Sequence, residues 1–140
     1  MRPKLLVDTS VWARVPRLPG VAEALSRWMT IGEVVTCPLV DLELLHSARG
    51  PAEYDAWADT RALAHRSLPL TAEAGSRALQ VQRELAHRGL HRVAKPPDLL
   101  IAAIAETAGV SLVHYDSDYD HIAEITGQPT QWIVERGSVD

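Results

Sequence analysis

The chain has 140 residues, which is enough for one domain, and we expect residues 1–140 to form a single unit. Its content of 46% hydrophobic and 23% charged residues is that of an ordinary globular protein. The apolar runs are far shorter than the roughly 20 residues that a membrane span requires, which argues against a membrane protein. The net charge of −4 argues against a general electrostatic attraction for nucleic acids.

The sequence favours the cytoplasm as the place where the protein acts. The N-terminal residues lead directly into a strand-like apolar run, so no signal peptide is expected. Cys37 is the only cysteine and cannot form an internal disulfide, which suits a reducing compartment. Its apolar surroundings in the sequence are typical of a buried, inert thiol.

Short apolar runs alternate with helical segments along the chain. Strands are predicted at 5–7, 33–37, 111–115 and 131–134, and helices at 21–29, from Pro38 onward, and at 52–64, 71–88, 96–108 and 118–126. Segment 66–70 is a short connection or a further strand. Strands separated by helices indicate a mostly parallel sheet joined by right-handed crossovers. The predicted fold class is therefore α/β, a three-layer α/β/α sandwich with a mostly parallel central sheet.

Acidic residues stand where the predicted strands end. Asp8 and Asp116 each follow a strand directly, and Glu43 lies in the first two turns of the helix after the second strand. Ligands bind open parallel sheets beyond the carboxyl ends of the strands, so these three side chains are expected at one edge.

A fourth acid, Asp98, lies at the start of the helix predicted at 96–108. It shares a helical face with Ile101, Ala102 and Ala105, so its carboxylate should point inward. We expect the helix dipole to favour its ionised form. Each acid taken alone has a structural explanation, because Asp8 can cap a helix, Asp98 can complement a helix dipole and Glu43 can be half-exposed.

The electrostatics of such a cluster favour a bound cation. Two carboxylates about 4 Å apart repel by roughly 4 kcal/mol at an effective dielectric constant near 20. Ligands that are all oxygen atoms select hard cations, so Mg²⁺ is the expected cofactor and Mn²⁺ a plausible substitute.

Further residues near these acids have two possible roles. Asp118 is either an additional metal ligand or the N-cap of the next helix. Thr9 and Ser10 can support neighbouring carboxylates by hydrogen bonds, although capping alone would also explain them. The stretch from Arg77 to Lys95 is net positive, and it forms either a solvated helix face or a phosphate-binding patch. Candidate RNA contacts in it are Arg88, Arg92 and Lys95.

Four segments that carry the acids resemble the motifs of the PIN-domain family. They are LLVDTSVW at 5–12, ELL at 43–45, PDLLIAA at 97–103 and HYDSDY at 114–119. Any one of them is weakly specific, but the ordered set is strong. The order, the spacing and the length of the chain resemble the VapC-type toxins of bacterial toxin–antitoxin pairs.

This resemblance implies a PIN-like fold and a Mg²⁺-dependent ribonuclease that is inhibited by a cognate VapB-type antitoxin and is usually a homodimer. Asp8, Glu43, Asp98 and Asp116 carry over as the catalytic constellation. We expect Asp8, Asp98 and Asp116 to hold one or two Mg²⁺ ions, and Glu43 to position the water that attacks an RNA phosphodiester.

Other functions remain open. A metal-dependent phosphatase or phosphotransferase with an aspartyl nucleophile at Asp8 would need a second aspartate at the position of Ser10. A histidine-based ribonuclease would need two imidazoles at one site, with His46, His114 and His121 as candidates. A catalytically inactive PIN module that binds RNA or protein would not need the intact set of acids.

Overall fold

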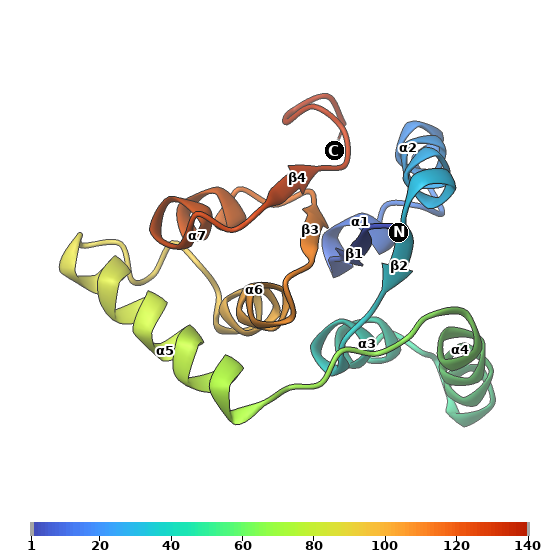
Figure 1. Cartoon of the computed structure of the whole chain (residues 1–140). Coiled ribbons are helices and arrows are strands. Elements are labelled where there is room, and N and C mark those ends of the chain that lie inside the picture. Colours follow the sequence, from blue (N-terminus) through green and yellow to red (C-terminus); the bar gives the residue numbers. More distant parts are fainter. Residues whose placement is uncertain (1, 140) are drawn as a thin grey trace.

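Four strands form one parallel sheet in the order β2-β1-β3-β4 (Figure 1). They are β1 (Lys4–Val7), β2 (Glu33–Val35), β3 (Ser111–His114) and β4 (Thr130–Trp132). The computed structural model describes residues 2–139, so Met1 and Asp140, the two ends of the predicted domain, lie outside the described residues. The chain passes from β1 to β2 on one side and then crosses to β3 on the other side of β1. The strand order therefore reverses between β1 and β3, where open α/β sheets bind their ligands.

Seven helices surround this sheet in the described part of the chain, and their ends follow the expected sequence signals. They are α1 (Thr9–Trp12), α2 (Pro19–Ile31), α3 (Pro38–Leu45), α4 (Pro51–Ala64), α5 (Ala72–His87), α6 (Pro96–Ala108) and α7 (Asp118–Thr126). Proline stands in the first turn of α2, α3, α4 and α6, where its missing N–H costs no hydrogen bond. Gly109 and Gly127 end α6 and α7 with φ of 70° and 69°, a conformation that favours glycine.

The two faces of the sheet are covered by different helices. Leu5 and Val7 of β1 pack with α2 in one apolar cluster, whereas Leu6 between them packs with α5 and α6 in another. Figure 1 shows α2 on one side of the sheet and α3, α5 and α6 on the other. This alternation confirms the predicted three-layer α/β/α arrangement, and it leaves the carboxyl edge of the strands free for polar side chains.

The predicted elements are all present, with small differences at their ends. The last strand is Thr130–Trp132 rather than 131–134, and segment 66–70 contributes only one parallel bridge, between Thr36 and Ser67. The one-turn helix α1 was not predicted. In the described residues, no helix combines the length and the apolar character that crossing a membrane requires.

The close approach of α2 to β1 depends on Gly32, which follows α2. A Cβ atom there would lie 2.9 Å from the carbonyl oxygen of Pro3 and 2.8 Å from Leu5 Cδ1. We expect Gly32→Ala to lower the free energy of unfolding by about 1–3 kcal/mol, because a backbone oxygen cannot move aside cheaply. Urea unfolding measures this. Gly75→Ala in α5, where a Cβ meets nothing within 4 Å, is the control and should raise stability by up to about 1 kcal/mol. Equal effects of the two changes would contradict the explanation.

Candidate metal centre

Asp8 lies at the point where β1 ends and α1 begins, and it is 3% exposed. Its Oδ2 accepts a hydrogen bond of 3.0 Å from the backbone N–H of Ser10, so it is the N-cap of α1. Its Oδ1 accepts a bond of 2.7 Å from the Tyr119 hydroxyl. The capping explanation for Asp8 is therefore correct. Capping does not exclude a metal, because each carboxylate oxygen has a second lone pair.

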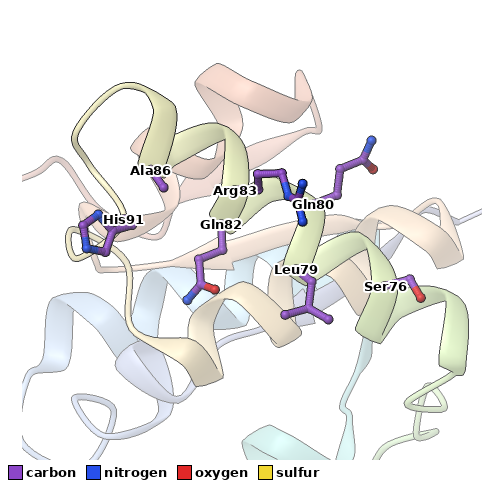
Figure 2. Close-up of a pocket in the computed structure, with 7 residues that line it drawn as sticks. All are labelled: Ser76, Leu79, Gln80, Gln82, Arg83, Ala86 and His91. Carbon is purple, nitrogen blue, oxygen red and sulfur yellow. The ribbon is translucent and has the colours of Figure 1, made fainter.

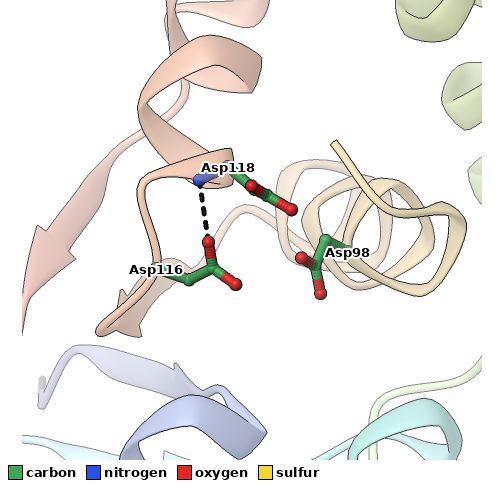
Figure 3. Close-up of side chains that lie close together, drawn as sticks. All are labelled: Asp98, Asp116 and Asp118. Atoms are coloured by element: carbon green, nitrogen blue, oxygen red, sulfur yellow. Dashed lines mark hydrogen bonds between the residues drawn. The ribbon is translucent and has the colours of Figure 1, made fainter. Parts of the chain in front are cut away.

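Asp116 and Asp118 come from the turn between β3 and α7. The backbone N–H of Asp118 donates to Asp116 Oδ1 at 2.9 Å, as Figure 3 shows. Ser117 occupies the N-cap position of α7, and Asp118 is the first helical residue, so the capping alternative for Asp118 is wrong. Its carboxylate points instead toward Asp98 (Figure 3). Burial raises the pKa of Asp118, but hydrogen bonds with Lys95 and Asp98 outweigh it, so the net shift is downward.

Asp98 is the third residue of α6 and is 4% exposed, as its apolar helical face predicts. Burial raises its pKa to about 8, and the carboxylates of Asp118 and Asp8 contribute further. The helix dipole was expected to favour the ionised form of Asp98, but the loss of hydration on burial has the larger effect, so the pKa is raised. Its Oδ2 atom is buried and has no hydrogen-bond partner among the described residues.

The hydroxyl of Tyr119 joins two of these carboxylates. It lies 2.7 Å from Asp8 Oδ1 and 3.3 Å from Asp98 Oδ1, and the side chain is fully buried. Burial and the neighbouring Asp8 raise the pKa of Tyr119 well above its ordinary value, so the hydroxyl keeps its proton. Tyr119 was not among the site residues predicted from the sequence. The sequence feature that could have indicated it is a side chain with a polar hydroxyl on the same face of α7 as the buried Ile122.

Glu43 approaches from α3 and is exposed, which separates it from the buried acids. The Thr9 hydroxyl, next to Asp8, donates to Glu43 Oε1 at 2.7 Å, as predicted for a supporting residue. Ser10 supports the site differently, since its Oγ accepts the backbone N–H of Tyr115 at 2.9 Å and joins the ends of β1 and β3. Glu43 therefore stands beside Asp8 at the same edge of the sheet.

Lys95 places a positive charge inside the acidic group. Its Nζ lies 2.8 Å from Asp118, 3.3 Å from Asp116 and 3.4 Å from Asp98. The hydrogen bond with Asp118 raises the pKa of Lys95 above its ordinary value, so the ammonium is charged. The sequence analysis had placed Lys95 only among possible RNA contacts. The contact with the acids could have been predicted from the spacing, because Lys95 stands three residues before Asp98, which was expected to be buried.

The rest of the basic stretch lies mainly along α5. Arg77 is paired with Glu106 of α6 at 2.7 Å, whereas Arg88 and Arg92 are exposed. A surface groove on α5, shown in Figure 2, is lined by residues that include Leu79, Arg83 and His91 but by no carboxylate. This groove therefore has no ligands for a hard cation.

The histidines do not form a catalytic pair. His114 is fully buried in β3, and burial lowers its pKa, so the ring is neutral. Its Nδ1 accepts the backbone N–H of Asp116 at 3.2 Å, while His46 is exposed on α3. Because His114 is fully buried, its ring cannot reach a bound RNA, so the candidate pairs that include His114 lose their support; the third candidate, His121, lies in α7.

The arrangement of acids fits a divalent cation. One ligand oxygen from each of Asp98, Asp116 and Asp118 lies within 4.8 Å of the other two. Asp98 Oδ2 is buried and accepts no hydrogen bond among the described residues, although Lys95 Nζ lies 3.4 Å away, and a cation would satisfy this oxygen. All the available ligand atoms are oxygens, as Mg²⁺ and Mn²⁺ prefer.

Comparisons with known proteins agree with this geometry. The family model of the PIN domain matches residues 5–125. The chain is 48% identical to ribonuclease VapC18 of Mycobacterium tuberculosis over 135 residues, which cover 95% of this chain and 97% of VapC18. It is 43% identical to ribonuclease VapC51 of the same organism, with 98% of each chain covered. In the crystal structure of VapBC2 from Rickettsia felis bound to promoter DNA, a chain superposes with a TM-score of 0.73 at 15% identity, covering 92% of this chain and 98% of that one.

These matches extend over nearly the whole chain, and the identity to the curated relatives is high. The protein therefore belongs to the PIN-domain family and, within it, to the VapC ribonucleases. PIN nucleases depend on a metal ion, and the acidic group described above is the part of the described chain suited to hold one.

The raised pKa of Asp98 predicts how the metal-free protein responds to pH. Between its ordinary value near 4 and about 8, the folded protein keeps a proton that the unfolded chain has lost. Stability contributed by this group is therefore lost as the pH rises through that range. Asp98→Asn removes the dependence. In the presence of a chelator, we expect the variant to gain stability over the wild type by roughly 1–3 kcal/mol between pH 5 and pH 8. Urea unfolding at several pH values measures this, and a difference that stays constant with pH would contradict it.

The hydrogen bonds of Tyr119 predict a second effect. Tyr119→Phe removes the hydroxyl that holds Asp8 and Asp98 together, with little change of shape. We expect the free energy of unfolding to fall by about 1–2 kcal/mol and the affinity for Mn²⁺ to fall severalfold. Thermal unfolding and Mn²⁺ titration measure these quantities. Tyr54→Phe, at an exposed position of α4, is the matched control and should change neither. Identical behaviour of the two variants would show that the Tyr119 hydroxyl does not support the site.

Proposed function

We propose that this protein is a Mg²⁺-dependent endoribonuclease that hydrolyses RNA phosphodiester bonds and acts as the toxin of a type II toxin–antitoxin system. The observation that carries the proposal is the group of buried and half-buried aspartates at the reversal point of the sheet, in which Asp98 Oδ2 is buried and accepts no hydrogen bond. Membership of the VapC ribonucleases supplies the reaction.

In this proposal Asp8, Asp98, Asp116 and Asp118 hold the cation. Asp8 and Asp98 are connected through Tyr119, and Asp98 faces the other two aspartates. A divalent cation held there would offset the cost of burying a carboxylate, and Asp98 would then be deprotonated. A bound Mg²⁺ or Mn²⁺ ion stabilises the negative charge that develops on the phosphate and makes water more acidic.

Glu43 is the general base of the proposed reaction. The carboxylate is exposed and therefore reaches a substrate on the surface, and the Thr9 hydroxyl fixes one of its oxygens at 2.7 Å. The free oxygen can accept a proton from water as the water attacks phosphorus. Because water is the nucleophile, the RNA 2′-hydroxyl takes no part in the chemistry, and preference for RNA comes from shape and from recognition of single-stranded loops.

The remaining partners follow from the family and from charge. Arg88 and Arg92 are exposed at the end of α5 and in the loop before Lys95, and they are proposed to contact RNA phosphates. A VapB-type antitoxin is the proposed inhibitor, since the structural relatives include VapBC toxin–antitoxin complexes. A homodimer acting in the cytoplasm completes the proposal.

Replacing a single carboxylate tests the proposal. Asp8→Asn keeps the cap of α1, because an asparagine oxygen also accepts the Ser10 N–H, but it removes a charge from the cation site. We expect RNA cleavage to fall by at least about 100-fold, with the stability of the metal-free protein unchanged or raised. Cleavage of a labelled RNA in Mg²⁺ measures the first effect and urea unfolding the second.

Asp59→Asn is the matched control, since it removes a charge from the exposed surface of α4. It should leave cleavage at the level of the wild type. Full cleavage by Asp8→Asn, or cleavage that persists in a chelator, would contradict the proposed function. Collapse of the fold in Asp8→Asn would instead assign Asp8 a purely structural role.

A further inference from the structure

Lys95 contacts Asp118 through both its backbone and its side chain. Its backbone N–H donates to Asp118 Oδ2 at 3.2 Å, and its Nζ donates to the same oxygen at 2.8 Å. Lys95 is also the N-cap residue of α6, and the prolines at positions 96 and 97 follow it. The backbone from which the ammonium reaches the acids is therefore fixed by a hydrogen bond and by two rigid residues.

The ammonium lies where a metal ion would meet the same carboxylates. The three acids within 4 Å of Nζ are Asp98, Asp116 and Asp118, the same three whose oxygens form the candidate cation group. The oxygen of Asp98 that faces Nζ at 3.4 Å is its buried Oδ2, which the contact does not satisfy as a hydrogen bond. Lys95 therefore donates hydrogen bonds to Asp116 and Asp118, whereas it only lies near Asp98 as an opposite charge.

Charge balance indicates how many divalent ions this arrangement accepts. With the exposed Glu43 left out, ionised Asp8, Asp98, Asp116 and Asp118, which are buried or half-buried, carry together with the ammonium of Lys95 a formal charge of −3. One divalent ion reduces this charge to −1, whereas a second ion would reverse its sign. A second ion would also have to displace an ammonium that already has three carboxylate partners, and close like charges repel strongly in a partly buried site.

We propose that Lys95 takes the place of a second divalent cation, so that the four aspartates bind one ion and the ammonium of Lys95 balances part of the remaining negative charge. The inference rests on the proposed function, because it assumes that the acidic group binds a divalent cation. It makes Lys95 a residue that sets the number of metal ions rather than one that contacts RNA. An exposed surface ion pair without such a role is the alternative, and such pairs contribute little.

Counting bound Mn²⁺ ions tests the inference without any measurement of RNA cleavage. The free Mn²⁺ signal in electron paramagnetic resonance is titrated with the wild type, Lys95→Met and Lys95→Arg. Methionine keeps the length of the side chain and removes its charge, whereas arginine keeps the charge. We expect one Mn²⁺ per chain for the wild type and for Lys95→Arg. For Lys95→Met we expect two ions per chain, with the first bound about tenfold more tightly than by the wild type.

Arg92→Met is the matched control, because Arg92 is an exposed cation in the same loop and has no ion pair among those found in residues 2–139. It should bind one ion with the affinity of the wild type. One ion in Lys95→Met would overturn the role of Lys95 and leave the proposed function intact. No bound ion in the wild type would overturn both, and two ions in the wild type would overturn the inference alone. Circular dichroism of Lys95→Met shows whether it is folded, which its exposed position predicts.

Discussion

The repulsion among carboxylates that the fold brings to one edge of the sheet is the constraint on which the site depends. Asp8 and Asp98 are almost completely buried, and Asp116 and Asp118 face Asp98 from the next turn. The apolar clusters on both faces of the sheet hold these side chains in place even though their charges oppose the arrangement. Without metal, the protein reduces the repulsion with a proton on Asp98, the Tyr119 hydroxyl and the Lys95 ammonium. A bound divalent cation would reduce the same repulsion.

For Asp8, capping a helix and belonging to the cation site are not alternatives. Asp8 follows β1, caps α1 and belongs to the acidic group. The same carboxylate therefore accepts the capping hydrogen bond and has a lone pair available for a cation. Ser10 connects the same turn to the end of β3 through Tyr115. The local geometry of the two strand ends therefore also determines the geometry of the site.

Much of the fold was predictable from the sequence, because the elements have clear local signals. The apolar runs at β1 and β3 and the prolines and glycines at helix ends predict most boundaries. The position of Asp98 on an apolar helical face predicted its burial correctly. The ionisation state of Asp98 was not predictable, because it depends on how much water the packed helices exclude and on which carboxylates lie nearby.

The contacts of two residues with the acids were not predicted, for a similar reason. Tyr119 reaches Asp8 across a sequence separation of 111 residues, and Lys95 reaches Asp118 across 23. The first contact depends on the position of α7 beside the end of β1, and the second on the packing of α6 against α7, so neither follows from a local sequence pattern. The basic residues from Arg77 to Lys95 do not form one surface. Arg77 is paired with Glu106 and Lys95 contacts the acids, whereas Arg88 and Arg92 are exposed.

Above all, we infer that a divalent cation binds where the strand order reverses. Anomalous scattering from crystals grown with Mn²⁺ tests it most directly, because it locates the ion without any assumption about activity. We expect one manganese peak in contact with carboxylate oxygens of this group of aspartates, with the ammonium of Lys95 still in contact with Asp118. The absence of a peak at this edge of the sheet, or a peak only elsewhere on the protein, would contradict the claim.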